Sequence, residues 1–323
     1  MTLEGKVALF ILGGTGFIGH EVVIQAMQAG WHLKALVRSE EGANKLQQVG
    51  AHPVVGDIHR PETWIAEVRG STALIDLTQP KFPKRLSHSA MKALSAERQA
   101  MTRATLEVLQ RLPAEERPIF FSVSGADDLR PDAQDTINER SPLRSHPSGF
   151  AHIGIPVRRL VEASGIEATY VYFGNLVYGP GKVFADQYIT GLKNGSARIL
   201  GKGTNRLPLV QVTDAARALV HLAGLPRSEL AGRTFIVMDG ADTTQRELLG
   251  DTAALMGVKR PGAVPAWLAA LVAGSIAVET ITLDAHADPL ALLATGFHFR
   301  YPSHRQGVPA TLAALGYTPS TNG

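Results

Sequence analysis

The chain has 323 residues, of which 45% are hydrophobic and 19% charged, a composition typical of a globular protein large enough for a full α/β core. Its formal net charge is +3 without a long basic run, so no nucleic acid is expected as a partner. It has no cysteine, which excludes disulfide bonds, thiolate nucleophiles and iron–sulfur ligation, and no metal site is predicted.

The first 125 residues alternate short β-branched runs with segments of helical periodicity. Strands are expected at VALFIL, HLKALV, HPVV, TALIDL and PIFFSV, and ATYVYFG (168–174) is expected to extend the same sheet. Helices are expected between the strands, at residues 16–29, 40–48, 61–68 and 86–111. Because strands and helices alternate, the sequence predicts an α/β fold with a doubly wound parallel sheet, the Rossmann fold.

The second half of the chain interrupts this alternation with loop-like stretches such as GPGKVFAD and LGKGTNRLP. We therefore expect a smaller carboxy-terminal substrate lobe beside the sheet. The predicted division places the nucleotide-binding domain at residues 1–177, with a return of the chain at 208–240. Residues 178–207 and 241–323 then form the substrate lobe.

One segment of this lobe, residues 261–278, is apolar for about the length of a minimal membrane span. It opens with prolines and has no basic flank beyond VKR, which favours a buried or interface helix over a membrane contact. The first apolar run, VALFIL, precedes a glycine-rich turn, as a strand does and a signal peptide does not. No integral membrane span and a cytoplasmic location are expected.

The stretch GGTGFIG (13–19) follows a predicted strand and opens a predicted helix, which is the context of a dinucleotide-binding loop. Gly13 permits the tight turn, Gly16 allows the backbone to approach a pyrophosphate, and Gly19 allows the helix to pack on the strand. The helix amides and dipole would hold the phosphates. A lone glycine pattern is weak evidence, but its position here makes a nucleotide site the favoured interpretation.

The end of the second predicted strand bears on which nucleotide is bound. An acid there would bond the ribose 2′-hydroxyl of NAD, but the sequence reads ALVRSEE and places Arg38 at the tip. A guanidinium suits a 2′-phosphate, so NADP(H) is favoured over NAD(H), although Glu40 and Glu41 weaken the distinction. Asp57 in GDI is either an adenine contact or a turn residue. The residues expected to contact the cofactor are Gly13, Thr15, Gly16, Phe17, Ile18, Gly19, Arg38, Asp57, Ile58, Leu77, Thr78, Ser122 and Asn175.

Several further motifs follow one another along the chain and bear on its family: LVRSEEG, VVGDI, FFSVSGA, NLVYGPG, LVQVTDAARALVHLA and FRYPSHRQGVPATLAALG. With GGTGFIG they make the chain similar, over nearly its whole length, to extended and atypical short-chain dehydrogenases/reductases. The similarity is to the NAD-dependent epimerase/dehydratase-like and NmrA-like branches. The resemblance implies a Rossmann domain, a carboxy-terminal substrate lobe, a bound nicotinamide nucleotide and a small-molecule substrate. A homodimer is also compatible with it.

Members of this family offer a tyrosine and, four residues later, a lysine. The tyrosine exchanges a proton with the substrate oxygen, while the lysine lowers the pKa of the tyrosine and bonds the nicotinamide ribose. Counting from INERSPLRSHPSGF upstream and from SGIEATYVYFGNLVYG downstream places these positions at Phe150 and Gly154. Neither residue can carry a proton, so the activity of sugar epimerases and dehydratases is not carried over.

Other side chains could replace part of the missing chemistry. Ser124, at the family's serine position, is expected to bond a substrate carbonyl or to stabilise an oxyanion. Tyr178 has a phenol near the expected cleft mouth, with packing under the lobe as the competing interpretation. His152 lies about 200° around a helix from Phe150 and should point away, whereas His146 in the preceding loop is freer to reach the site.

Some reductions need no protein acid. Quinones and other conjugated acceptors take hydride to give stabilised anions that water can protonate. We therefore expect an NADP(H)-dependent oxidoreductase acting on a quinone- or enone-like carbonyl, with an NADP(H)-binding regulator and a non-redox lyase or isomerase as alternatives. Apolar side chains suit a flat acceptor. The expected pocket walls are Gly125, Phe150, Phe173, Asn175, Gly179, Phe184 and Gln187.

Overall fold

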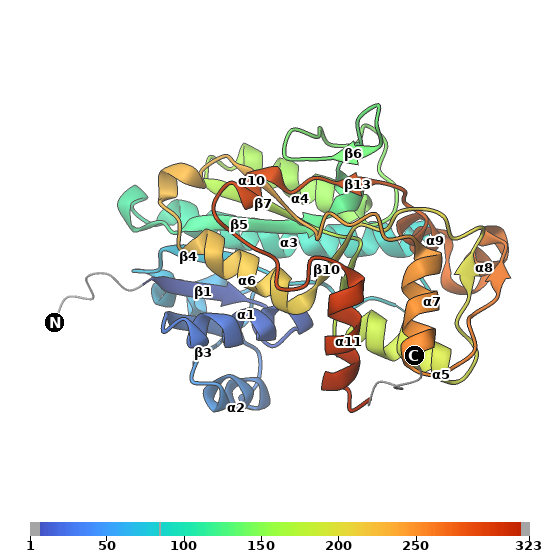
Figure 1. The fold of residues 1–323 in the computed structure, drawn as a ribbon. Helices are drawn as coiled ribbons and strands as arrows, with labels where there is room; N and C mark the ends of the chain where they lie inside the picture. The colour runs from blue at the N-terminus through green and yellow to red at the C-terminus, as the bar shows by residue number, and fades with distance from the viewer. Residues whose placement is uncertain (1–6, 84, 318–323) are drawn as a thin grey trace.

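The computed structural model describes residues 7–83 and 85–317. Its main element is a seven-stranded parallel sheet in the order β11-β7-β5-β4-β1-β2-β3 (Figure 1). The strand order reverses between β1 and β4, which confirms the doubly wound Rossmann fold. The strands are β1 (Ala8–Leu12), β2 (His32–Val37), β3 (His52–Val55), β4 (Ala73–Asp76), β5 (Ile119–Gly125), β7 (Ala168–Phe173) and β11 (Thr234–Val237).

Helices cover both faces of this sheet (Figure 1). One apolar core joins the sheet to α1 (Phe17–Gln28), α2 (Glu40–Gln48) and α6 (Val212–Ala223). A second core joins it to α3 (His88–Arg111) and α4 (Ala151–Ala163). The bounds of α1, α2 and α3 agree with the predicted helices to within two residues, because their apolar periodicity matches the face that each helix buries.

Both faces of the central strands are buried. In β1, Leu9 and Ile11 enter the first core, whereas Phe10 and Leu12 enter the second. Successive side chains of a strand point to opposite faces, so a strand covered on both sides must be apolar throughout. This requirement explains why VALFIL reads as an unbroken hydrophobic run.

The helix predicted at 61–68 is wrong in type. The segment instead forms two 3₁₀ turns, η1 (Pro61–Thr63) and η2 (Ile65–Val68), which meet at Trp64. The indole of Trp64 is fully buried, stacks on Phe10 at 5.6 Å between ring centroids and donates to the Asp57 carbonyl at 3.0 Å. Tertiary contacts of one large side chain therefore override the local helical pattern.

The carboxy-terminal half contributes short parallel pairs and a separate apolar cluster around α7 (Gln245–Leu255) and α11 (His304–Ala314). The pairs link segments that are distant in sequence, and the other lobe helices are short. The remaining strands are β6 (Thr136–Ile137), β8 (Leu176–Tyr178), β9 (Ile199–Leu200), β10 (Leu209–Gln211), β12 (Ala263–Val264) and β13 (His286–Ala287). They pair as β6–β13, β8–β10 and β9–β12. Short helices of this part are α5 (Thr190–Lys193), α10 (Leu290–Leu293) and the π-helical η5 (Phe184–Ile189).

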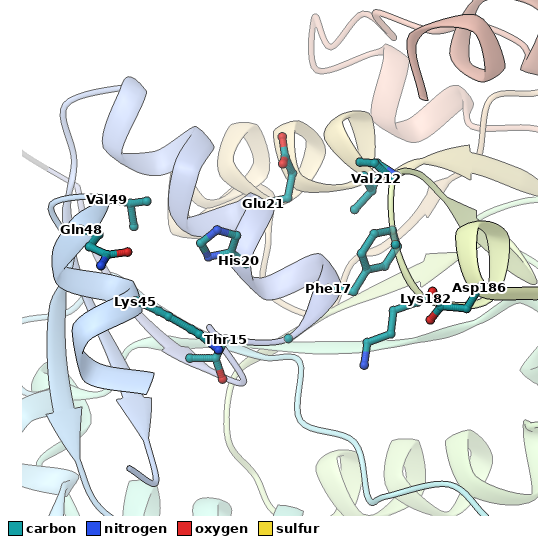
Figure 2. A pocket seen from close by; sticks show the side chains of 13 residues that line it. Thr15, Phe17, His20, Glu21, Lys45, Gln48, Val49, Lys182, Asp186 and Val212 are labelled. Carbon is teal, nitrogen blue, oxygen red and sulfur yellow. The ribbon is translucent and has the colours of Figure 1, made fainter. Parts of the chain in front are cut away.

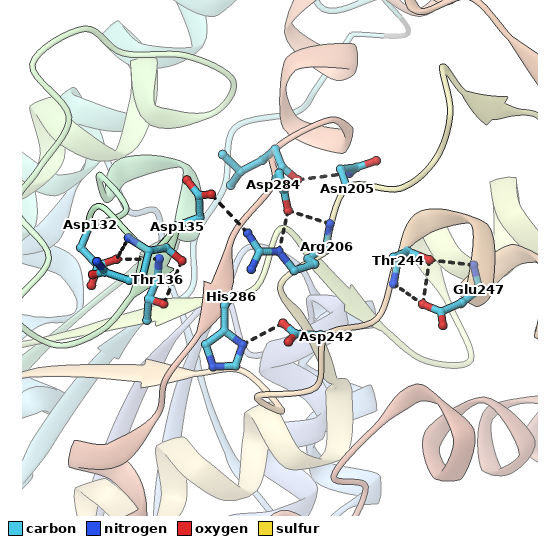
Figure 3. Close-up of polar contacts among 12 residues, drawn as sticks. Asp132, Asp135, Thr136, Asn205, Arg206, Asp242, Thr244, Glu247, Asp284 and His286 are labelled. Carbon is cyan, nitrogen blue, oxygen red and sulfur yellow. Dashed lines mark hydrogen bonds and ion pairs between the residues drawn. The ribbon is translucent and has the colours of Figure 1, made fainter.

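Polar contacts join these segments to one another (Figure 3). The guanidinium Nε of Arg206 donates to Asp284 at 2.8 Å, and another nitrogen of Arg206 lies 3.7 Å from Asp135, close to β6. His286 of β13 contacts Asp242 at 2.8 Å. Arg206 thus connects the loop before β13 to the loop before β6.

The apolar segment 261–278, predicted as a buried or interface helix, is not a single helix and is not buried over α8, which corrects that part of the prediction, while an interface role stays a prediction. It contains α8 (Ala266–Ala273) and the start of α9 (Ser275–Ile281), separated at Gly274. The side chains of α8 are not buried, and Trp267 is 68% exposed. Within the described residues, no helix is long and apolar enough to span a bilayer.

Candidate functional site

The glycine-rich turn brings three backbone segments into close contact. Gly13 adopts φ +85°, and a Cβ there would lie 2.8 Å from the Leu77 carbonyl oxygen after β4. A Cβ at Gly19 would lie 2.1 Å from the Gly13 carbonyl oxygen, so only glycine allows α1 to approach the turn this closely. Gly16 precedes α1 as its N-cap, with no side chain bonded to the first helix amides.

Those amides suit an external acceptor. The amino end of a twelve-residue helix carries unsatisfied N–H groups and a partial positive charge. Thr15, Phe17 and Ile18 accompany the glycines at this end, and their contact with a cofactor stays a prediction. The backbone cradle therefore fits the pyrophosphate of a dinucleotide.

A cleft of about 700 Å³ opens beside the cradle, between α1, α2 and the loop before η5 (Figure 2). Lys45 extends from α2 toward Thr15, and Lys182 enters from the opposite side. Lys182 adopts φ +53°, and Lys45 also pairs with Glu41 at 2.6 Å. Neither lysine was expected from the sequence, because only the fold brings 45 and 182 to one cleft.

Arg38 is exposed immediately after β2. Of the two acids that follow, Glu41 is engaged by Lys45, and its pKa is lowered by that hydrogen bond and charge. Ser39 caps α2 by accepting from the Gly42 amide at 3.2 Å. Arg38 has no ion-pair partner within residues 7–83 and 85–317, so its guanidinium is available to a ligand.

The ends of β3, β4 and β5 carry the other expected cofactor residues. Asp57 is exposed and accepts from the His59 amide at 3.0 Å, which supports the turn interpretation without excluding a ligand contact, while Ile58 is buried beside it. Thr78 donates to Asp76 at 2.6 Å, and Ser122 is buried opposite Asp76 in the sheet.

Asp76 itself was not predicted as a site residue. It is buried and forms an ion pair with Arg98 of α3 at 2.9 Å, while Arg98 also donates to Thr102 at 2.8 Å. Breaking such a buried pair leaves an uncompensated charge. The pair therefore fixes the carboxyl end of β4, and with it Leu77 and Thr78, against α3. An acid inside TALIDL was the sequence signal for it.

Ser124 ends β5 beside two buried acids. Its hydroxyl donates to Asp128 at 2.6 Å. Asp127 accepts from the Phe150 amide at 2.8 Å and from the Thr280 hydroxyl at 2.8 Å, so it caps the start of α4. Burial raises the pKa of both carboxyls, that of Asp128 well above its usual range. The DD pair of SGADD marked these acids, but sequence reasoning passed over them.

Phe150 is the N-cap residue of α4, Gly154 lies in its first turn, and both are next to these acids. Phe150 is half-buried and meets Phe82 edge-on at 5.5 Å between ring centroids. A Cβ at Gly154 would lie 2.2 Å from both carboxyl oxygens of Asp128 and 2.3 Å from the Ser124 hydroxyl. Whether these two positions are the tyrosine and lysine positions of the family stays a prediction.

The other proton-bearing candidates are less well placed. Tyr178 is fully buried, its hydroxyl donates to the Ser303 carbonyl at 3.4 Å, and burial raises its pKa. These contacts favour the packing interpretation. His152 meets His88 of α3, away from Ser124, and His146 is exposed beside Ser145.

Three of the expected pocket walls are Phe173, Phe184 and Asn175. Phe173 is buried in the first core and Phe184 in the cluster around α7 and α11, so both pack inside the protein, which corrects the expectation that they are pocket walls. Asn175 donates to the Thr280 carbonyl at 2.9 Å, and its own amide oxygen is buried without a partner among the described residues. That oxygen can accept a hydrogen bond from a ligand.

The geometry agrees with comparisons to known proteins. Residues 9–237 match the model of the NAD dependent epimerase/dehydratase family. The chain belongs to this family. Among curated relatives, it is 25% identical over 308 residues to a 3-diazoavenalumate denitrifying reductase of a Streptomyces species, covering 93% of this chain and 98% of that protein.

Two further comparisons differ in extent. A photosystem II assembly factor Ycf39 of Trieres chinensis is 45% identical, but over only 69 residues, which are 21% of this chain and 22% of that protein. The human epimerase family protein SDR39U1, solved with NADPH, superposes with a TM-score of 0.77 at 17% identity, covering 95% of this chain and 99% of that one. At that identity the likeness shows the fold alone.

Proposed function

We propose that the protein is an NADP(H)-dependent oxidoreductase that reduces a conjugated or activated carbonyl without a tyrosine–lysine pair. One observation carries this proposal: the dinucleotide cradle and Ser124 lie at the same edge of the sheet, and Gly154, which is next to Ser124, has no room for a side chain. The reductase named among the relatives, which aligns over nearly its whole length, supports the same reaction class.

The nucleotide-binding part uses this chain's own groups. The amino end of α1, with Thr15, Gly16 and Phe17, would hold the pyrophosphate. Arg38 would pair with a 2′-phosphate, since its position after β2 is otherwise that of a ribose-binding acid. When bound, the nicotinamide supplies the electrons for reduction. The family description names NAD and the structural neighbour carries NADPH, so the preference for NADP(H) depends on Arg38.

On the substrate side, the single proton of the Ser124 hydroxyl, which otherwise goes to Asp128, would be donated to the carbonyl oxygen and would stabilise negative charge there. Phe150 and Phe82 form an apolar aromatic pair beside it, suited to a flat acceptor. Conjugation would spread the charge that develops on the acceptor, so a strong acid is not required for such substrates.

The test measures NADPH binding by calorimetry and NADPH consumption with phenanthrenequinone, menadione and an aliphatic enone. We expect binding, and turnover with at least one conjugated acceptor, but no oxidation of simple secondary alcohols above about 1 s⁻¹, the low end of typical enzyme turnover. Binding without turnover on any acceptor would overturn the reductase and favour an NADP(H)-responsive regulator.

A further inference from the structure

Asp128 is a buried acid that the proposed reduction has not yet used. Its side chain is buried, and the Ser124 hydroxyl lies 2.6 Å from one carboxyl oxygen. Ser124 itself is half-exposed at the end of β5. The hydroxyl therefore lies between a buried carboxyl and the partly exposed end of β5.

The two arginines near Asp128 are engaged by other groups. Arg158 of α4 is engaged by Glu162 at 2.6 Å and by the Tyr172 hydroxyl of β7 at 3.3 Å. Arg144, from the loop before α4, donates to the Asp127 backbone carbonyl at 2.9 Å. Neither arginine forms an ion pair with Asp128 in the part of the chain that the structure describes.

Burial and the charge of Asp127 raise the pKa of Asp128, whereas the two arginines lower it. Asp127 lies next to Asp128 on η4 (Ala126–Asp128) and adds like charge. Burial is the largest effect, and together with Asp127 it outweighs the hydrogen bond from Ser124 and the two arginines. The pKa of Asp128 is accordingly raised well above its usual range, which favours the protonated form of this carboxyl.

Gly154 explains why the acid can be here. The two Asp128 oxygens and the Ser124 hydroxyl occupy the space in which any Cβ at 154 would lie. A residue larger than glycine would displace the carboxyl or break its contact with Ser124. The glycine and the buried acid are therefore complementary features of one arrangement.

We propose that Asp128 is the proton reservoir of the site and that it acts through the Ser124 hydroxyl. This inference rests on the proposed reductase function. The carbonyl carbon gains a hydrogen with its electron pair from the reduced nicotinamide nucleotide, and the carbonyl oxygen gains the Ser124 hydroxyl proton. With Asp128 protonated, its O–H is the donor and the Ser124 oxygen the acceptor of their hydrogen bond, so Ser124 recovers a proton from Asp128, which is left as a carboxylate. Asp128 regains its proton from water through the same hydroxyl after the product leaves.

The first test needs no cofactor. Infrared difference spectra between acidic and alkaline pH should contain the carbonyl stretch of a protonated carboxylic acid that persists above the usual aspartate range. Asp127 and Asp239 are also buried acids with raised pKa values, so Asp128→Asn should remove one component of the band, and that component should remain in Asp239→Asn. A spectrum unchanged by Asp128→Asn would overturn the proposal.

The second test separates this proposal from the reductase function itself. An aldehyde such as 4-nitrobenzaldehyde needs a proton at its oxygen, whereas phenanthrenequinone gives a stabilised anion. We expect Asp128→Asn to lower aldehyde reduction by about 10²-fold or more and quinone reduction by less than about threefold. In the wild type, aldehyde reduction should be maximal below the Asp128 pKa and fall as pH rises through it, and this dependence should disappear in the variant.

The outcomes are distinguishable. If the wild type reduces neither substrate, the reductase function fails. If it reduces aldehyde and quinone but Asp128→Asn lowers both equally, or keeps the wild-type pH profile, the proton reservoir is wrong and the reductase function stands. Ser124→Ala should match the effect of Asp128→Asn on the aldehyde, because the carboxyl acts through that hydroxyl. NADPH affinity should be unchanged in Asp128→Asn.

Discussion

At the scale of single residues, the space beside Gly154 determines what chemistry the site can perform. Restoring the tyrosine–lysine pair by Phe150→Tyr with Gly154→Lys is the obvious way to test a resemblance to short-chain reductases. The structure shows that the Cβ atom of a lysine at 154 would overlap with the Asp128 carboxyl and the Ser124 hydroxyl. A smaller substitution reports on this space more cleanly.

Gly154→Ala should force Asp128 to rotate and lose its 2.6 Å contact with Ser124. Overpacking costs about 1–3 kcal/mol, and the gain of about 1 kcal/mol from replacing glycine in a helix offsets part of it. We expect a net loss of about 0–2 kcal/mol in urea unfolding and the loss of the pH dependence of aldehyde reduction. Gly262→Ala, which meets no atom within 4 Å, is the control. An unaltered pH profile in Gly154→Ala would contradict this account.

Arg38 determines the expected nucleotide preference. Because its guanidinium lies at the tip of β2, NADPH should bind at least about tenfold tighter than NADH, equivalent to about 1.4 kcal/mol. Arg38→Ala should remove most of that preference by weakening NADPH alone. Arg69→Ala, at an exposed pair with Glu116, should leave both affinities unchanged. Equal affinities of the wild type for the two nucleotides, measured by calorimetry, would refute the assignment.

At the scale of elements, a glycine determines how the apolar segment of the lobe is divided. Gly274 separates α8 from α9 with φ +94° and ψ +154°, a backbone region open to glycine and little else. A Cβ there would lie 2.1 Å from the Leu86 carbonyl oxygen, just before α3. The break therefore both redirects the chain and lets it pack against the start of α3, while Ile276 of α9 is buried beside Met91.

Gly274→Ala should destabilise the protein by about 1–3 kcal/mol from backbone strain, with a further cost from the collision with Leu86. The matched control is Gly70→Ala, since Gly70 also has a positive φ, +78°, but no atom within 4 Å of its Cβ position. The control should lose about 1–2 kcal/mol. Thermal unfolding of both variants measures the difference, and equal losses would show that the contact with Leu86 is unimportant.

At the scale of the whole molecule, buried carboxyls should make stability depend on pH above the acid range. Burial raises the pKa of Asp239 to about 7 and also raises those of Asp127 and Asp128. In the unfolded chain these groups lose their protons near pH 4, so the folded state holds more protons between that pH and the folded pKa values. Stability from these groups is complete below about pH 4 and is lost as pH rises through the folded values.

We therefore expect the free energy of unfolding in urea to fall between about pH 6 and pH 8, with part of the slope removed in Asp239→Asn. Exposed acids with lowered pKa values, such as Glu67 and Asp284, make the free energy of unfolding rise with pH, but only in the acid range where these carboxyls titrate. They do not affect the range from 6 to 8. A wild-type slope of zero or of opposite sign in that range would contradict the prediction.

The sequence by itself determined the sheet and the nucleotide cradle, because both depend on local patterns. Continuous apolar runs separated by helical periodicity suffice for a doubly wound sheet, and GGTGFIG identifies its own turn. Local patterns failed where one distant contact dominated. The buried indole of Trp64 replaced a predicted helix with two 3₁₀ turns, and Gly274, packed closely against Leu86, divides the apolar segment.

Only the tertiary structure determined which groups meet at the candidate site. Positions 150 and 154 read as two losses in the sequence, since nothing local connects them to the acids of η4. The fold packs α4 against the end of β5, and Asp128 then fills the space left by Gly154 and contacts Ser124. The reason is physical: the pKa of a carboxyl depends on its burial and on neighbouring charges from other elements, and the sequence does not specify either.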